Sequence, residues 1–107
     1  MVRARYSRND YTHSLVVVGH AGYSSEGNDI VCSGVSAIVY SLLGFLHNAV
    51  DKDDRLTASV DSGESLIFWK GNSVEVNAAF QMAVIGLAQM AKKHPHHVSV
   101  EISAEGA

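Results

Sequence analysis

The amino-acid sequence predicts an α+β domain, a mixed β-sheet with two helices packed over it, in the element order ββαββαβ. Three observations predict this class. Five short segments carry the apolar pattern of strands, two longer segments repeat apolar residues every three to four positions, and turn-forming residues separate them. Strands and helices that interleave along one chain favour a two-layer arrangement of helices on a sheet.

Length and composition indicate a single domain over residues 1–107. A chain of 107 residues lies near the commonest size of one domain, and its 47% of hydrophobic residues can fill one core. Charged residues make up 18%, which is too few for a disordered chain. We expect one unit without repeats, linkers or low-complexity segments.

The first strand is predicted to begin at Val2 and the second to cover residues 13–19. Val2, Ala4 and Tyr6 alternate with arginines, which places the arginines on a solvated strand face. The four apolar residues at 15–18 are typical of a central strand buried on both faces of its sheet. His20 follows directly, where this strand gives way to a loop.

A glycine-containing loop and a long helix come next. The loop over residues 19–28 holds three glycines with serines and an asparagine, a composition that predicts an adaptable backbone. The following apolar residues share one helical face; they fall at positions 31, 35, 38, 39, 42, 43 and 46. Asp29 is predicted to cap this helix, which places Cys32 in its first turn. We expect the helix to end near residues 47–50.

The second half of the chain predicts a hairpin, a second helix and a last strand. Segments 56–60 and 65–69 flank a turn and form the hairpin. A helix is predicted over about 73–93, because five apolar residues share one face: Val76, Phe80, Val84, Leu87 and Ala91. Pro95 stops this helix, and residues 98–102 alternate as the last strand.

Net charge and cysteine content exclude further classes. A formal net charge of −3 gives no overall basic field, so we expect no direct binding to nucleic acid. The single cysteine excludes an internal disulfide and favours a reducing cytoplasm. The N-terminus lacks the apolar core of a signal peptide, and no stretch approaches 18 uninterrupted apolar residues. We therefore expect neither export nor contact with a membrane.

Cys32 is the candidate nucleophile. Unpaired amides and the positive end of the helix dipole stabilise a thiolate in the first turn, and the same amides could hold the oxyanion of an attacked acyl group. A lone cysteine is also often a small buried hydrophobe. His20 ends a strand and can face the helix start across the loop, which predicts a dyad with Cys32. Asp29 would be a third member that orients the imidazole, although capping explains it equally well.

These residues resemble the signature of the ribosomal-processing cysteine protease Prp family. The matching positions are Gly-His-Ala at 19–21, Gly27, Asp-Ile-Val-Cys at 29–32, and Ser36. In that family a histidine and a cysteine twelve positions apart form the catalytic pair, and His20 and Cys32 have that separation. The chain is also similar to the family in length and in element order.

The resemblance implies a cytoplasmic endopeptidase, usually a homodimer, that removes an N-terminal extension from the bacterial large-subunit ribosomal protein L-twenty-seven. It implies that Cys32 attacks the scissile carbonyl, that His20 handles the proton and that loop 21–28 closes around the peptide. Substrate contacts are expected from Gly22, Gly27, Asp29 and Ser36. No metal and no organic cofactor are expected. The alternative function is a non-catalytic dimeric module that binds a peptide or ribosomal partner, with Cys32 buried.

Three histidines surround Pro95. His94, His96 and His97 match no closed metal site in spacing, and neither a carboxylate nor a second cysteine stands nearby to complete four ligands. We expect them to form a solvated connection between the second helix and the last strand.

Overall fold

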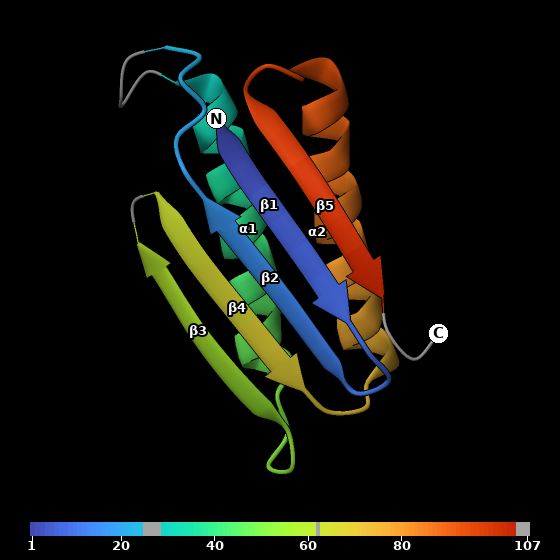
Figure 1. Ribbon diagram of the computed structural model, residues 1–107. Helices are drawn as coiled ribbons and strands as arrows, with labels where there is room; N and C mark the ends of the chain where they lie inside the picture. The colour runs from blue at the N-terminus through green and yellow to red at the C-terminus, as the bar shows by residue number, and fades with distance from the viewer. Residues whose placement is uncertain (25–28, 62, 105–107) are drawn as a thin grey trace.

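The computed structural model describes residues 1–24, 29–61 and 63–104, and its elements confirm the predicted order ββαββαβ (Figure 1). All five predicted strands and both predicted helices are present. The elements are β1 (Val2–Arg8), β2 (Thr12–Val18), α1 (Ile30–Ala49), β3 (Arg55–Asp61), β4 (Glu64–Lys70), α2 (Val74–Lys93) and β5 (Val98–Ala104).

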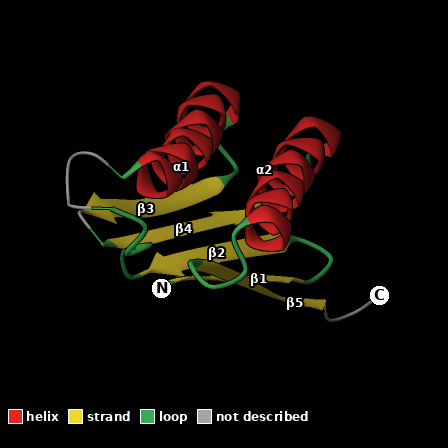
Figure 2. Ribbon diagram, turned by 90° about the horizontal axis from the view of Figure 1, so that it is seen from above, coloured by secondary structure: helices red, strands yellow, loops and turns green. Residues whose placement is uncertain are grey.

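The strands form one mixed sheet in the order β3-β4-β2-β1-β5. β5 pairs parallel to β1, and every other neighbouring pair is antiparallel. Both helices lie on the same face of this sheet, so the domain has two layers (Figure 2). The end of β2, the start of α1, the β3–β4 turn and the start of β5 meet at one end of the sheet (Figure 1).

β2 is central, as predicted, but the prediction that both of its faces are buried is wrong. Leu15 and Val17 point under the helices and are buried, whereas Val16 is half-buried and Val18 is 44% exposed. Because both helices cover one face, the other face of the sheet stays open. A run of apolar residues does not show on how many faces a strand is covered.

The core lies between the helices and the covered face of the sheet. α1 buries one stripe of its residues there, and α2 buries another, while Trp69 and Phe80 are the largest fully buried side chains. Each helix is long enough and apolar enough to cross a membrane by length and composition alone. Their packing on the sheet is that of core helices.

His13 is a buried polar residue within this apolar core. Its Nδ1 lies 2.6 Å from the Tyr6 hydroxyl, and its ring stacks on Phe80 with ring centroids 4.5 Å apart. Burial, with a smaller contribution from the positive charge of Arg8, lowers the pKa of His13 from 6.5 to about 4. The folded protein therefore holds this imidazole neutral.

Lowering the pH from 7 to 5 should cost the folded protein about 2 kcal/mol through His13 alone. In the unfolded chain the imidazole takes up a proton below pH 6.5, whereas in the folded protein it stays neutral down to about pH 4. Its contribution to stability is thus complete above 6.5 and is lost as the pH falls toward 4. Urea denaturation at pH 7, 6 and 5 measures the free energy of unfolding.

The matched variants isolate this histidine. His13→Phe keeps a ring against Phe80 and should flatten the fall in stability between pH 7 and 5. His47→Ala removes an exposed histidine near the end of α1 and should keep the wild-type slope. A steep slope that survived in His13→Phe would assign the pH dependence to other groups.

Candidate active site

Asp29 joins the start of α1 to the loop before it. Its Oδ1 accepts hydrogen bonds from the backbone N–H groups of Val31 and Cys32, each at 3.0 Å. Its Oδ2 accepts from the N–H groups of Tyr23, at 3.0 Å, and Ser24, at 3.3 Å. These amides, that of Cys32 foremost, hold the pKa of the Asp29 carboxyl below its ordinary value. The predicted N-cap is confirmed, and the carboxylate is ionised at neutral pH.

In the described structure Asp29 has the capping role, one of the two roles that the sequence left open. Its carboxylate is buried and bonded to backbone amides, and within residues 1–24, 29–61 and 63–104 it has no hydrogen bond to His20. Asp29 therefore fixes the loop and the cysteine, while the histidine is held by other means.

Three first-turn amides of α1, those of Val31, Cys32 and Ser33, are already bonded, and for these three the expectation that they hold an oxyanion is wrong. Asp29 Oδ1 takes the N–H groups of Val31 and Cys32, and the backbone oxygen of Asp29 accepts from the N–H of Ser33 at 3.0 Å. The aspartate cap uses the donors that a substrate would need. The positive end of the helix dipole still lies beside Cys32.

The Cys32 thiol faces a cavity and has a backbone donor of its own. The side chain is half-buried, and its Sγ accepts a hydrogen bond from the N–H of Ala21 at 3.1 Å. This contact joins the loop after β2 to the nucleophile across eleven residues of sequence.

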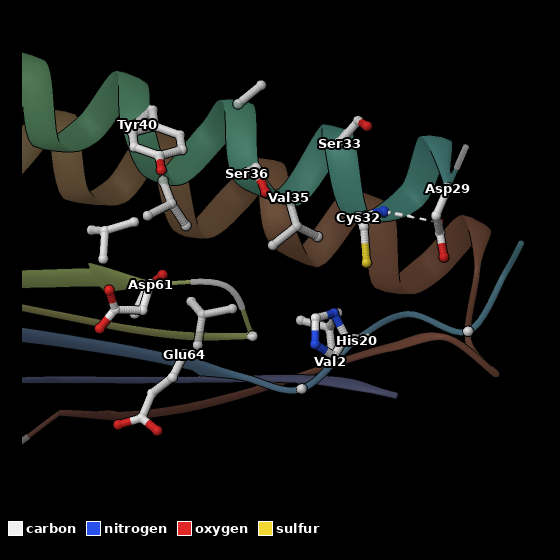
Figure 3. A pocket seen from close by; sticks show the side chains of 18 of the residues that line it. Val2, His20, Asp29, Cys32, Ser33, Val35, Ser36, Tyr40, Asp61 and Glu64 are labelled. Atoms are coloured by element: carbon white, nitrogen blue, oxygen red, sulfur yellow. Dashed lines mark hydrogen bonds between the residues drawn. The ribbon is translucent and has the colours of Figure 1, made fainter. Parts of the chain in front are cut away.

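His20 lies across the cavity from Cys32. Figure 3 shows the Cys32 sulfur pointing down from α1 toward the wall that carries the His20 ring. The imidazole is exposed, and within the described residues no hydrogen bond joins it to the thiol. Catalytic hydrogen bonds are often long before substrate binds and tighten in the complex, so this arrangement suits a dyad.

Gly63, in the β3–β4 turn, supports the His20 ring and was not singled out from the sequence. A Cβ atom at Gly63 would lie 2.7 Å from His20 Nε2, so a larger residue there would make the imidazole shift from this position. The Gly63 oxygen also accepts a hydrogen bond from the N–H of Gly19 at 2.8 Å, and its φ of +78° suits glycine. The signal in the sequence was a turn glycine, which is too common to indicate a site.

Gly63→Ala should lower kcat/KM by roughly 10- to 100-fold, because the new methyl group displaces the His20 ring from its position over the cavity. The backbone strain of a left-handed alanine adds about 1 kcal/mol to the cost in stability. Peptide hydrolysis and thermal unfolding measure the two effects separately.

Two further variants separate the effect of a Cβ atom against the His20 ring from the effect of backbone strain at position 63. Gly63→Asn tolerates the left-handed backbone better than alanine but still places a Cβ against the ring, so its activity should stay low. Gly44→Ala lies in α1 with nothing within 4 Å of the new methyl group and should leave activity unchanged. Full activity in Gly63→Asn would show that a Cβ atom at position 63 does not disturb the His20 ring, and would contradict this prediction.

One cavity of about 700 Å³ collects the predicted site residues that the structure describes. Its lining includes the predicted residues His20, Gly22, Asp29, Cys32 and Ser36. Gly27 lies outside the described residues, as does the second half of loop 21–28, which was expected to close on substrate. The structure thus brings the predicted pair and three predicted contacts together, and their roles in binding stay predictions.

The two long walls of the cavity differ in chemistry. Ser36 and Tyr40 follow Cys32 along α1 on one wall, and Asp61 and Glu64 of the β3–β4 hairpin stand on the other (Figure 3). Hydroxyl groups on one side and carboxylates on the other suit an extended peptide, which offers amide groups along its length.

The connection after α2 was expected to be solvated, and for two of its three histidines this is wrong. His97 Nδ1 lies 2.9 Å from the backbone oxygen of Ala21, and the ring edges of His94 and His97 meet Tyr23. His96 is exposed, as expected. The parallel pairing of β5 with β1 brings this connection to the loop, which sequence spacing does not reveal. Among the described residues no group of three His, Cys, Asp or Glu side chains could hold a metal ion.

The chain matches a protein-family model described as cysteine protease Prp over residues 1–99. No curated protein matches it by sequence. Several solved structures share the fold, and the following three are among them. The essential ribosomal processing protease Prp from S. aureus, in complex with a covalently linked product peptide, has a TM-score of 0.80 at 19% identity, over 95% of this chain and 99% of that chain. A complex of Prp from S. aureus with a substrate peptide has a TM-score of 0.72 at 18% identity, over 95% and 99%. SMU.848 from Streptococcus mutans has a TM-score of 0.71 at 24% identity, over 98% and 96%.

Proposed function

Because the chain belongs to the cysteine protease Prp family, whose members are hydrolases, we propose that it removes the N-terminal extension of the bacterial large-subunit ribosomal protein L-twenty-seven. The observation that carries the proposal is the placement of His20 and Cys32 on facing walls of one cavity, with the sulfur bonded to a backbone N–H. The similar S. aureus protease is a ribosomal processing enzyme with structures in complex with peptides.

The first half of the reaction is acyl transfer to sulfur. The thiol proton of Cys32 passes to His20, and the sulfur attacks the scissile carbonyl carbon, forming an S–C bond while the carbonyl oxygen takes the negative charge. The Ala21 N–H donates to the Cys32 sulfur and so holds it in position for this attack. The C–N bond then breaks, and His20 returns its proton to the leaving amine.

The second half releases the acyl group. Water attacks the thioester carbon and gives a proton to His20. The S–C bond breaks, the new terminus leaves as a carboxylic acid, and the sulfur recovers its proton from His20. Every proton in the cycle is carried by this one imidazole, and the chain needs no cofactor for it.

The proposal is tested with a synthetic peptide that spans the junction between the extension and the mature ribosomal protein. Mass spectrometry of the products identifies the bond that is cut. Cleavage at the junction supports the proposal. Iodoacetamide added to a separate sample of the same folded protein checks that Cys32 is reactive. If the peptide then stays intact after prolonged incubation with the untreated protein, this substrate is removed from the proposal.

The alternative, a non-catalytic module that binds a peptide or ribosomal partner, requires a buried cysteine. Cys32 is instead half-buried and lines the cavity. Rapid alkylation by iodoacetamide at pH 6 would count against the binding module, because a buried or un-ionised thiol reacts slowly there.

We also propose, following the family resemblance, that the protein works in the cytoplasm as a homodimer. Sedimentation at micromolar concentration should then give about twice the 11.5 kDa mass of one chain. If sedimentation at micromolar concentration gives the mass of one chain, the dimer is removed from the proposal, while the proposed reaction is unaffected.

A further inference from the structure

We infer that His97 is a positioning residue that holds Ala21 in place, so that the Ala21 N–H stays directed at the Cys32 sulfur. The inference rests on the proposed function and assigns a residue 65 positions beyond the nucleophile in sequence to the same site. His97 touches neither the sulfur nor the imidazole of the dyad in the described structure, so it acts through the loop.

Ala21 is fixed at three points. Its N–H donates to Cys32 Sγ at 3.1 Å, its methyl group is buried at 2% exposure, and its oxygen lies 2.9 Å from His97 Nδ1. The next residue, Gly22, has a φ of +67° and nothing within 4 Å of where a Cβ would lie. Glycine is the residue whose backbone is freest to turn, so the bond to His97 restrains the chain just before a point where it could otherwise rotate.

His97 is itself held by the backbone around it. Its oxygen accepts from the N–H of Val2 at 2.9 Å, which ties it to the first residue of β1, and its own N–H donates to the oxygen of His94 at 2.9 Å. The ring of Tyr23 meets His97 edge-on with centroids 5.3 Å apart and His94 with centroids 5.4 Å apart. The sheet and the end of α2 thus provide a rigid base for the imidazole.

The loop after β2 is therefore held from two sides. Asp29 takes the N–H groups of Tyr23 and Ser24 from the α1 side, and His97 takes the Ala21 oxygen from the β5 side. Only the contact with His97 involves Ala21 itself, the residue whose N–H donates to the Cys32 sulfur. Without it the Asp29 cap still orders α1, but the donor to sulfur is free to turn away.

The chemistry of the contact fixes which His97 nitrogen carries a proton. A carbonyl oxygen only accepts, so Nδ1 must donate, and both the neutral Nδ1–H tautomer and the imidazolium can do so. The other titratable side chains that line the cavity with Cys32 are those of His20, Asp29, Tyr40, Asp61 and Glu64. None of these side chains has a hydrogen bond to His97 among the described residues, so a change at His97 reaches the thiol through Ala21.

The test follows the rate of Cys32 alkylation by iodoacetamide against pH, a readout that needs no substrate. His97→Phe keeps an aromatic ring against Tyr23 but has no donor; its alkylation at pH 6.5 should be roughly five- to tenfold slower, with the midpoint of the profile moved to higher pH. His97→Asn places an amide N–H near the position of Nδ1 and should recover most of the rate. His96→Ala removes the exposed neighbouring histidine and should match wild type.

Hydrolysis of the junction peptide gives the second readout, a fall in kcat for His97→Phe with little change in KM. An unchanged alkylation profile in His97→Phe would overturn the inference. Equal losses in His97→Phe and His97→Asn, in step with thermal stability, would also overturn it, because they would mark a merely structural residue. A wild-type protein that shows the expected profiles but cuts no peptide would instead refute the proposed function and leave the role of His97 standing.

Discussion

Cys32→Ala should lose hydrolysis of the junction peptide by about 10⁴-fold or more in kcat/KM, because Cys32 carries the only thiol among the described residues of the cavity. Cys32→Ser should lose nearly as much, since a hydroxyl ionises far less readily than a thiol and the Ala21 N–H cannot compensate. Product formation is followed by mass spectrometry at several enzyme concentrations. The wild-type protein quenched in acid should carry the mass of the acyl fragment.

The matched control for the nucleophile is Ser33→Ala, which removes an exposed hydroxyl from the next residue of the same helical turn. It should keep activity within about twofold of wild type, because it leaves Asp29 bonded to the Ser33 amide. Both cysteine variants should still fold, since Cys32 is only half-buried and the cap depends on its backbone rather than on its sulfur. Turnover in folded, contaminant-free Cys32→Ala would reject the covalent route.

The sequence predicts well where α1 begins and that Cys32 lies in its first turn, because the interactions that set this helix start are between residues close in sequence. Asp29 caps amides two and three residues ahead of it, and the apolar stripe that begins at Val31 already indicates the buried face. Contacts within one turn of helix depend on spacing alone. The position of the nucleophile could therefore be predicted without knowing how the rest of the chain folds.

The residues that surround the dyad could not be predicted, because their contacts depend on which strand ends meet. Gly63 reaches His20 only since β4 pairs with β2, and His97 reaches Ala21, 76 residues away in sequence, only since β5 pairs with β1. Nothing in the sequence around a turn glycine or around a histidine after a helix indicates which distant residue it will contact. The same limit explains β2, whose apolar run did not show that the helices cover one face.

The pairing of His20 with Cys32 was predicted from a strand end, a loop and a resemblance, and the structure adds a reason for the orientation of the ring. Gly63 lies against the imidazole where the sequence suggested an acidic partner. Glycine leaves space for the ring at this position, and among the described residues neither ring nitrogen of His20 has a hydrogen-bond partner. A dyad without a carboxylate is thus the arrangement that the geometry favours over a triad with Asp29.

His20→Ala should lower kcat by roughly 10³-fold while the protein remains folded, because the exposed ring contributes little to the core. The variant leaves an imidazole-sized space beside Gly63 and opposite the sulfur. Added imidazole should therefore restore part of the activity in a saturable manner, and more at alkaline than at acidic pH, since only the neutral base accepts the thiol proton. Peptide hydrolysis over a series of imidazole concentrations measures this rescue.

Two controls show whether the added imidazole acts from the space that the His20 side chain leaves. Imidazole should not accelerate Cys32→Ala, which lacks the nucleophile, and it should rescue His20→Ala less when Gly63→Ala is present, because the added methyl group occupies the space that the ring needs. The double variant thus links the general base to the glycine that shapes its site. If His20→Ala instead turned over at the wild-type rate, the proton would have to move through another group, and the Cys32 thiolate would owe its reactivity to the helix dipole and the Ala21 N–H alone.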